Sequence, residues 1–281
     1  MTDLQILVVS NRHTAAGPKE TERVCTALRQ SGATVVEREF QTRSGSQAMA
    51  DIPPETDLVV AIGGDGTIMH AAKCAAGRDL PVLGINSGKL GFLAGLEVNE
   101  TDRLQALFTR EYEIEERLLL DVTVDGDAGT HLAMNEAVVS RGALSRLVDL
   151  TVVSGGQDVM RYRADGVMIA TPTGSTAYSL SAGGPVVDPS VEALLLTPIC
   201  PHSLYARSYV FSAETELTVR PTASDGNTFL TVDGEREISL LPGQAVTVRR
   251  SAMTAKLIRL KKQSFYDILN HKLINRDGGR V

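Results

Sequence analysis

A single carboxylate stands between glycines near residue 65, and this is the clearest sign of chemistry in the sequence. Residues 63–67 read Gly-Gly-Asp-Gly-Thr and follow the apolar run 58–62. A strand, a glycine turn and a helix N-terminus form an anion site, because backbone N–H groups point outward and missing Cβ atoms let phosphate oxygens approach. A carboxylate there fits a general base or a ligand of Mg²⁺. We predict that Asp65 is catalytic; the alternative is that it only caps the helix.

The two commonest nucleotide-binding loops do not match this chain. A Walker loop would have to end at Gly88-Lys89, but Leu90 follows and Leu83 stands where the first glycine belongs. The dinucleotide fingerprint is also missing, because its third glycine would fall on Met69. The turn around Asp65 is therefore a different kind of phosphate site.

A second unusual stretch covers residues 165–185. It combines hydroxyl side chains, glycines and one tyrosine, Tyr178, behind a predicted strand. Small donors beside a flat ring suit a ligand that carries sugar hydroxyls and planar rings. A serine hydrolase is excluded, because Ser181 has Ser179 rather than glycine two residues before it. The alternative is a glycine-rich loop that merely turns a strand into a helix.

Alternating strands and helices position the first of these motifs. The apolar patterns predict strands at residues 4–9, 34–40, 58–62 and 81–85, with helices at 18–31, 68–76 and about 100–108. Such alternation is typical of a parallel sheet with helices outside it. We therefore expect an α/β domain over residues 1–112.

The period changes to that of strands after about residue 112. Strand-like runs occupy residues 118–124, 132–140, 147–153, 217–220, 229–232, 245–249 and 256–260. Their number favours a two-sheet, sandwich-like domain over residues 113–261. Helical spacing returns near residue 263, and we expect the C-terminal helix, within residues 262–281, to pack back onto the first domain.

Composition limits the class of protein. The chain has 281 residues, enough for about two domains at roughly 150 residues each. Hydrophobic residues make up 43% and charged residues 22%, as in ordinary globular proteins, and no apolar run approaches the ~20 residues of a membrane span. The net charge of −6 argues against a nucleic-acid binder. The three cysteines suggest neither disulfides nor zinc. We expect a cytoplasmic protein without nucleic-acid or membrane partners.

Three motifs, in their order along the chain, resemble those of the NAD kinases. They are the turn at residues 63–67, Asn135-Glu136, and the block at 165–185. The turn alone also occurs in diacylglycerol and sphingosine kinases, but the sequence Thr-Pro-Thr-Gly-Ser-Thr-Ala-Tyr-Ser-Leu-Ser-Ala-Gly-Gly-Pro is highly characteristic of NAD kinases. Residues 91–93 and 198–204 are similar to the family as well. The resemblance runs from about residue 58 to the C-terminal helix.

This resemblance implies a transferase of NADP biosynthesis. The 2′-hydroxyl of the adenosine ribose of NAD would attack the γ-phosphate of ATP, giving NADP and ADP. The cofactor would be Mg²⁺ or another divalent metal, bound through the ATP phosphates with no protein ligand identified. NAD and ATP would be the small-molecule partners, and the resemblance also implies a homodimer or homotetramer.

The resemblance also implies roles for individual residues. Asp65 would be the general base. The ATP phosphates would contact Gly63, Gly64, Gly66, Thr67 and His70. The NAD site would comprise Asp65, Gly66, His70, Asn135, Glu136, Arg146, Arg163, Asp165, Thr176, Ala177, Tyr178, Ser179, Leu180 and Ser181. Asp165 would lie near the nicotinamide, from the same or a neighbouring subunit, and Arg163 resembles residues that favour NAD over NADH.

Two alternative functions remain open at this stage. A lipid kinase would share the Asp65 turn but would need an apolar acyl-chain pocket in place of the hydroxyl-rich block. A non-catalytic NAD-binding sensor would keep that block and could dispense with Asp65. Asn135, Glu136, Arg146 and Arg163 could also each be ordinary residues at the rim of a β domain.

Overall fold

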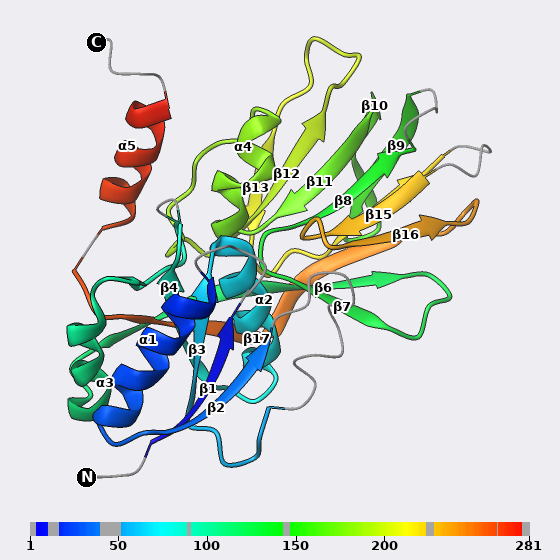
Figure 1. Ribbon diagram of the computed structural model, residues 1–281. Helices are drawn as coiled ribbons and strands as arrows, with labels where there is room; N and C mark the ends of the chain where they lie inside the picture. The colour runs from blue at the N-terminus through cyan, green and yellow to red at the C-terminus, as the bar shows by residue number, and fades with distance from the viewer. Residues whose placement is uncertain are drawn as a thin grey trace. The chain divides into compact units, whose positions relative to one another are not determined.

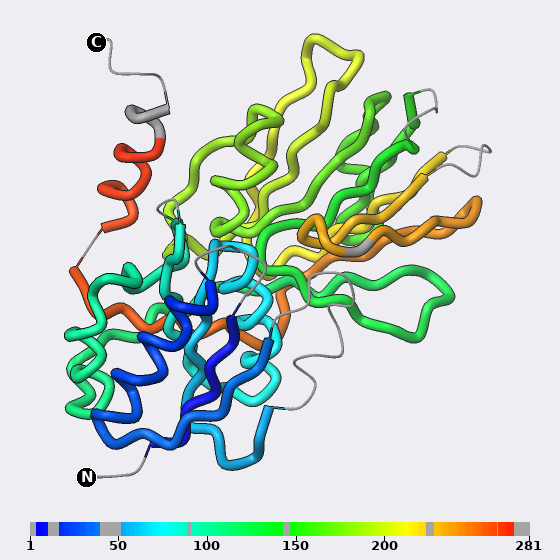
Figure 2. The backbone as a smooth tube through the Cα atoms, viewed as in Figure 1, coloured from blue at the N-terminus to red at the C-terminus, as the bar shows by residue number. Residues whose placement is uncertain are grey.

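The computed structural model describes residues 4–10, 17–39, 52–88, 91–142, 147–222, 228–262 and 264–276. The chain divides into two compact units, residues 1–116 with 255–281, and residues 117–254. In Figure 2 the first unit runs from blue into green and returns in red, while the second unit is mostly green, yellow and orange. The domain boundaries expected from the sequence, after residues 112 and 261, stay a prediction.

The first unit contains a parallel sheet. Its strands β1 (Gln5–Ser10), β2 (Thr34–Glu39), β3 (Leu58–Gly63) and β4 (Pro81–Asn86) lie in the order β2-β1-β3-β4 (Figure 1). Strand β4 also pairs in parallel with β5 (Leu96–Glu97) and with the end of β17 (Val246–Arg259). The α/β class expected for this part of the chain is confirmed.

Helices cover both faces of this sheet. Val60 and Ile62 of β3 share a buried cluster with Leu28 of α1 (Gly17–Gln30). Gly84 of β4 instead faces α2 (Asp65–Ala76), because a Cβ there would lie 2.7 Å from Cδ1 of Ile68. A strand with neighbours on both faces needs apolar residues at every position, which explains the unbroken apolar runs.

The described part of the first unit has three further helices. They are η1 (Thr101–Gln105), α3 (Ala106–Thr109) and α5 (Phe265–Arg276). Helix α5 packs back as expected: Ile268 is buried, and the Phe265 ring centroid lies 6.0 Å from that of Phe92.

The strand order places the Asp65 turn at a switch point of the sheet. The chain goes from β1 outward to β2, then returns to the other side of β1 for β3. Ligands of such open α/β sheets bind beyond the carboxyl ends of the strands where the order reverses. The turn at residues 63–67 follows the carboxyl end of β3, so its location is that of a ligand site.

The second unit contains two antiparallel sheets. One sheet has the order β13 (Tyr209–Ser212), β12 (Ala193–Ile199), β11 (Gly166–Ala170), β8 (Glu136–Arg141), β15 (Thr228–Val232) and β16 (Arg236–Leu240). In the other, β10 (Gln157–Ala164), β9 (Val148–Ser154), β14 (Leu217–Pro221) and the first part of β17 are neighbours in that order, and β6 (Glu113–Val124) pairs with β17 and with β7 (Thr130–Ala133).

Alternate side chains of the two sheets form one core. Val139 of β8 and Ile169 of β11 join Val152 of β9 and Val219 of β14 in a single buried cluster. This arrangement confirms the sandwich-like fold. The sequence patterns did not predict β10, whose strand alternates exposed Arg161 and Arg163 with buried neighbours.

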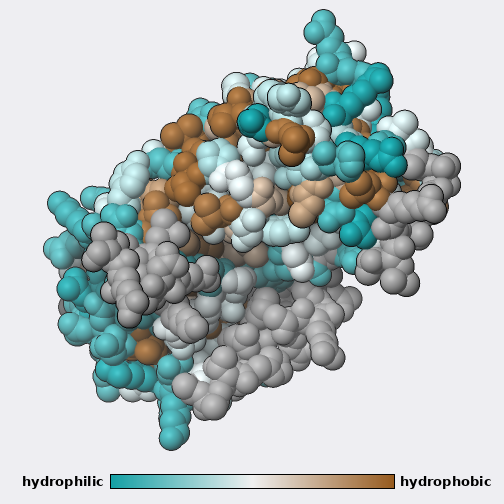
Figure 3. Space-filling view, turned by 90° about the horizontal axis from the view of Figure 1, so that it is seen from above, coloured by the Kyte–Doolittle hydropathy of each residue, from teal (hydrophilic) through white to brown (hydrophobic). Residues whose placement is uncertain are grey.

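The surface mixes polar and apolar residues. Figure 3 shows brown, apolar residues interspersed with teal and white ones on the face seen from above. Leu204 and Tyr205 of the second unit are among the most exposed apolar side chains, at 90% and 88%. No helix within the described ranges has the length and apolar character needed to cross a membrane.

Candidate functional site

Asp65 is the first residue of α2, but its side chain does not cap that helix. The N-cap residue is Gly64, whose carbonyl accepts hydrogen bonds from the backbone N–H groups of Thr67 and Ile68. The Asp65 carboxylate instead accepts the backbone N–H of Phe92 at 2.9 Å and that of Leu93 at 3.1 Å. Two fixed donors from another segment therefore set the orientation of the carboxylate.

The glycines around this carboxylate divide into two kinds. A Cβ at Gly91 would lie 2.1 Å from Oδ1 of Asp65, and one at Gly63 would lie 2.6 Å from Oγ1 of Thr67. These two positions therefore need glycine for packing. A Cβ at Gly64 or Gly66 would meet no protein atom within 4 Å. The open side of the turn is thus at the helix N-terminus, where phosphate oxygens are favoured.

Basic residues from the C-terminal part of the chain support this turn. Arg259 donates hydrogen bonds to the carbonyl oxygens of Phe92, Leu93 and Ala94 at 3.2, 3.1 and 2.7 Å. It thereby holds the segment whose amides bind Asp65. Nζ of Lys272, on α5, lies 3.5 Å from Oδ2 of Asp65. Neither residue was predicted from the sequence, because no local motif marks them.

Thr67 and His70 lie further inside the first unit. Both are only 5% exposed, and Nε2 of His70 lies 3.7 Å from Sγ of Cys74 one helical turn away. The contact of His70 with substrate phosphate stays a prediction.

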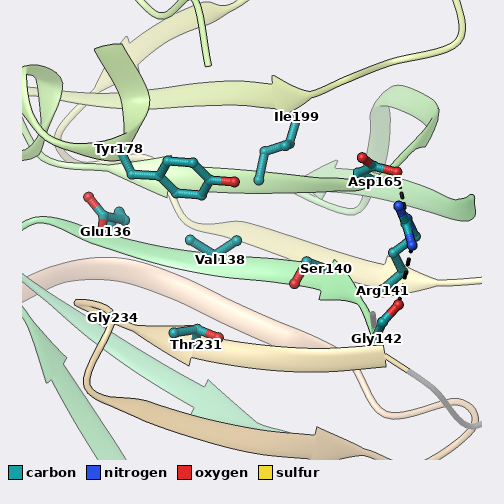
Figure 4. Close-up of a pocket in the computed structure, with 10 residues that line it drawn as sticks. All are labelled: Glu136, Val138, Ser140, Arg141, Gly142, Asp165, Tyr178, Ile199, Thr231 and Gly234. Carbon is teal, nitrogen blue, oxygen red and sulfur yellow. Dashed lines mark hydrogen bonds and ion pairs between the residues drawn. The ribbon is translucent and has the colours of Figure 1, made fainter. Parts of the chain in front are cut away.

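The second unit has a pocket of about 460 Å³ on the outer face of its six-stranded sheet. Alternate residues of β8 point into it, while those between them face the core. The lining residues come from β8, from its sheet neighbourhood on β12 and β15, from α4 (Tyr178–Ser181) and from connections after β8, β10 and β15 (Figure 4): Glu136, Val138, Ser140, Arg141, Gly142, Asp165, Tyr178, Ile199, Thr231 and Gly234. Its volume is within the range of small-molecule sites.

Asp233 fixes the turn that carries Asn135 and Glu136. Its carboxylate accepts three backbone N–H groups, from Met134 at 2.9 Å, Asn135 at 2.8 Å and Glu136 at 3.1 Å. The Asp233 side chain is buried, and its backbone φ of 50° is left-handed. On the other side, Oγ1 of Thr171 donates to the Met134 carbonyl at 2.6 Å. The backbone of residues 134–136, just before and at the start of β8, is therefore fixed by hydrogen bonds with two side chains.

A charged pair stands at one end of the pocket. Nε of Arg141 donates to Oδ1 of Asp165 at 2.6 Å, and this hydrogen bond raises the pKa of the Arg141 guanidinium. Figure 4 shows the pair at the end of the pocket away from Tyr178, which lies toward Glu136. The negative charge of Asp165 is therefore paired within the protein.

The structure brings together three of the predicted NAD residues, Glu136, Asp165 and Tyr178, in one pocket. Tyr178 begins α4 (Tyr178–Ser181) and is 47% exposed, so its ring is available for stacking. Ser179 is buried and shares a hydrogen bond with Thr197.

The other predicted NAD residues are placed differently. Asn135 adjoins the pocket residue Glu136, and Thr176 ends η2 (Thr173–Thr176), where its hydroxyl donates to the Thr173 carbonyl at 3.3 Å. Ala177, Leu180 and Ser181 lie in or beside the short helix α4. Arg146 lies outside the described residues.

Arg163 lies in β10, which ends at Ala164, so it does not share a strand with Asp165. Arg163 is paired with Asp149 in one sheet, whereas the Asp165 N–H donates to the carbonyl of Ile199 in the other. The chain passes from one sheet to the other between these two residues. Their side chains therefore need not lie on the same face, as those of residues two apart in one strand do. Arg163 is exposed and is not among the residues that line the pocket.

Ser140, Arg141 and Thr231 were not predicted as site residues. A usable signal existed for Ser140: it lies four residues after Glu136 in a strand, and such residues share a face. Thr231 is the register partner of Val138 on β15, which is visible only in the folded sheet.

Both units match family models. Residues 6–112 match the ATP-NAD kinase N-terminal domain, and residues 134–260 match the ATP-NAD kinase C-terminal domain. An NAD kinase of Symbiobacterium thermophilum is 50% identical over 223 residues, covering 78% of this chain and 79% of that protein. An NAD kinase of Geobacter metallireducens is 39% identical over 245 residues, covering 85% and 87%.

Solved structures show the same fold. Yeast NADH kinase complexed with NADH aligns with a TM-score of 0.87 at 26% identity, covering 100% of this chain and 90% of that chain. An NAD kinase from Archaeoglobus fulgidus in complex with ATP aligns with a TM-score of 0.78 at 27% identity, covering 98% and 100%.

Proposed function

We propose how the residues of this chain, which belongs to the ATP-NAD kinase family, carry out the reaction of an NAD kinase. The enzyme transfers the γ-phosphate of ATP to the 2′-hydroxyl of the adenosine ribose of NAD, giving NADP and ADP. The comparisons support neither the lipid kinase nor the non-catalytic sensor.

Asp65 acts as the general base in this proposal. The supporting observation is its carboxylate, which two backbone N–H groups orient at the N-terminus of α2. A group held in this way loses little freedom when a hydroxyl approaches, and proton removal by a positioned base typically contributes about 10²–10⁴-fold. The 2′-hydroxyl gives its proton to Asp65 as its oxygen bonds to the γ-phosphorus.

ATP binds along the open side of the glycine turn. The space beside Gly64 and Gly66 and the positive end of α2 favour the phosphates there. In the described part of the chain, His, Cys, Asp and Glu form no cluster of three that could hold a metal. Mg²⁺ needs no such cluster, since it commonly binds substrate phosphates, waters and one or two carboxylates. The divalent ion would reach the turn with the ATP phosphates and would neutralise their β- and γ-oxygens.

NAD occupies the pocket of the second unit. Asn135 and Glu136 hold the adenosine part, Tyr178 stacks on a ring, and Asp165 lies toward the nicotinamide. The rigid turn under Asp233 and the exposed tyrosine ring support these roles. The complexes of similar proteins with NADH and with ATP support the two ligands. We also expect the protein to be cytoplasmic and to form a homodimer or homotetramer. Light scattering would measure the mass of this oligomer.

The test is incubation of the purified protein with NAD, ATP and Mg²⁺, followed by detection of NADP with an NADP-specific dehydrogenase. We expect NADP in amounts equal to the ADP formed. Omission of ATP is the control, and a parallel reaction offers diacylglycerol in place of NAD. Phosphorylation of the lipid without formation of NADP would contradict the assignment.

A further inference from the structure

Lys272 contacts the catalytic turn although it is 207 residues from Asp65 in sequence. Its Nζ lies 3.5 Å from Oδ2 of Asp65 and 3.9 Å from the centre of the Phe92 ring. Its helix α5 is anchored beside this ring by Phe265 and by the buried Ile268. A cation on a docked helix therefore stands next to the proposed base.

The contact between Lys272 and Asp65 is loose. Both carboxylate oxygens already accept backbone N–H groups, at 2.9 and 3.1 Å. An ammonium bound tightly to a carboxylate lies at about 2.7–2.9 Å, well below the 3.5 Å found here. The side chains of Lys272 and Asp65 are 28% and 35% exposed. Because a lysine stem is flexible, Lys272 can turn toward a stronger acceptor that enters the site.

Two other cations near this C-terminal segment are engaged elsewhere. Arg259 is bound to Glu115 and to the carbonyl oxygens of the segment after Gly91. Lys261 forms an ion pair with Glu100. Of these three described cations, Lys272 is the one that lies beside Asp65 and the one whose ion pair is long, at 3.5 Å.

A cation beside Asp65 would help to hold a phosphate at this turn, in addition to the proposed divalent ion. The carboxylate of Asp65 repels the negative triphosphate, and the amides of the turn carry only partial charges. During phosphoryl transfer, charge is spread over the three equatorial oxygens of the transferred group. A mobile ammonium beside the base would reduce the repulsion before transfer and stabilise these oxygens during it.

We propose that Lys272 is a further catalytic residue, whose ammonium binds the γ-phosphoryl group during its transfer. The inference rests on the proposed function. The 2′-oxygen forms a bond to the γ-phosphorus, and the bond from that phosphorus to the β–γ bridging oxygen breaks. The hydroxyl proton moves to Asp65, the electron pair of the broken bond stays on ADP, and Lys272 remains protonated as a hydrogen-bond donor.

The main test variant is Lys272→Met, which keeps a stem able to pack on Phe92 and removes the charge. We expect kcat to fall by about 10²–10³-fold, as for loss of other donors that stabilise transition-state charge. The KM for NAD should change less than about threefold, because the proposed contact of Lys272 is with the γ-phosphoryl group of ATP and not with NAD. Lys272→Arg should retain more activity than Lys272→Met. The matched control is Lys262→Ala, an exposed lysine just before α5, which should keep wild-type rates.

A second measurement separates a catalytic role from a structural one. Lys272→Ala leaves space where the ammonium stood, so added ethylammonium should restore part of its turnover. The same salt should not raise the activity of Lys262→Ala or of Asp65→Asn. Tetramethylammonium, which has no N–H donor, should restore nothing. A merely structural defect would not respond to a small amine.

Three results would overturn the inference. An unchanged kcat in Lys272→Met would show that the ammonium takes no part in transfer. An increased kcat would show that Lys272 restrains Asp65, as in an autoinhibitory contact. A low kcat with a lowered melting temperature and no response to ethylammonium would show a structural role. Wild-type protein that makes no NADP would instead refute the proposed function itself.

Discussion

At the scale of single residues, the two candidate sites differ in the hydrogen-bond and ion-pair partners of their carboxylates. Asp65 receives two backbone N–H groups and a loose cation. Asp165 is paired directly with Arg141 at 2.6 Å. The Asp65 side chain is 35% exposed, and each of its oxygens can accept a proton besides its backbone hydrogen bond, whereas the Asp165 carboxylate has a permanent partner in Arg141. The geometry therefore supports a base at Asp65 and a positioning role for the pair in the pocket.

Asp65→Asn tests the base directly. The amide keeps the size of the side chain but cannot take the proton, so we expect turnover to fall at least ~10²-fold. One of the two backbone donors should then face an NH₂ group, which should lower the free energy of unfolding by about 1 kcal/mol. Steady-state kinetics and urea denaturation measure the two effects. Turnover near that of the wild type would remove Asp65 from the mechanism.

Arg141→Gln tests how the pocket discriminates between oxidised and reduced dinucleotide. The nicotinamide ring is cationic in NAD and neutral in NADH, so a carboxylate nearby favours NAD by Coulomb attraction. Because Arg141 neutralises Asp165, its removal should raise the NAD-to-NADH ratio of kcat/KM, by roughly two- to fivefold.

Arg161→Gln serves as the control for this change. Arg161 is an exposed cation on β10 that pairs with Asp158, outside the pocket lining. If Arg141→Gln leaves the ratio as it is in the wild type, the charge of Asp165 does not set the preference. The family resemblance predicts that Arg163→Gly lowers the NAD-to-NADH ratio of kcat/KM. This variant can be measured in the same experiment.

At the scale of elements, each site depends on a strand whose end is fixed by a distant segment. The turn after β3 is oriented by residues 91–94, whose carbonyl oxygens accept hydrogen bonds from Arg259 of β17. The turn before β8 is oriented by Asp233, which follows β15. In both cases a buried or half-buried side chain satisfies backbone groups that the sheet leaves unpaired, as buried backbone groups require.

Asp233→Ala should therefore weaken both the fold and substrate binding. Three backbone N–H groups lose their acceptor at once, so we expect the free energy of unfolding to fall by about 2–3 kcal/mol. The KM for NAD should rise, because Asn135 and Glu136 lose their fixed backbone. Urea denaturation and kinetics measure this, with the exposed Asp158→Ala as control. Wild-type stability would show that the three hydrogen bonds are replaced by water without cost.

At the scale of the whole molecule, the chain combines two units with different periods of hydrophobic residues. The first buries strands on both faces under helices, and the second buries alternate residues between two sheets. Each unit has a hydrophobic core of its own, and we therefore expect both to fold without a metal. The proposed metal requirement would then belong to the reaction and not to folding.

Removal of divalent metal tests this separation. Excess chelator should abolish formation of NADP, because phosphoryl transfer depends on metal to neutralise the β- and γ-oxygens. The melting temperature without nucleotide should stay unchanged, since the metal arrives with ATP. Return of activity on addition of Mg²⁺ is the control. Full activity in chelator, or unfolding by it, would contradict the proposal.

Local patterns in the sequence were enough to predict the fold class and the Asp65 turn. Residues 58–62 indicate a strand buried on both faces without reference to any other residue, and the glycines after it predict an anion site. The shift from helical to strand periodicity after about residue 112 likewise indicates the sandwich. These features depend on neighbours within a few positions along the chain, which a sequence displays directly.

Tertiary structure alone decided which distant side chains complete the sites. Asp233 reaches Asn135 across 98 positions, Arg259 reaches Phe92 across 167, and Lys272 reaches Asp65 across 207. An aspartate after a strand or a lysine in a C-terminal helix has no local mark of such a role. The physical reason is that hydrogen bonds and charges act over a few ångströms in space, and only folding determines which residues come within that distance.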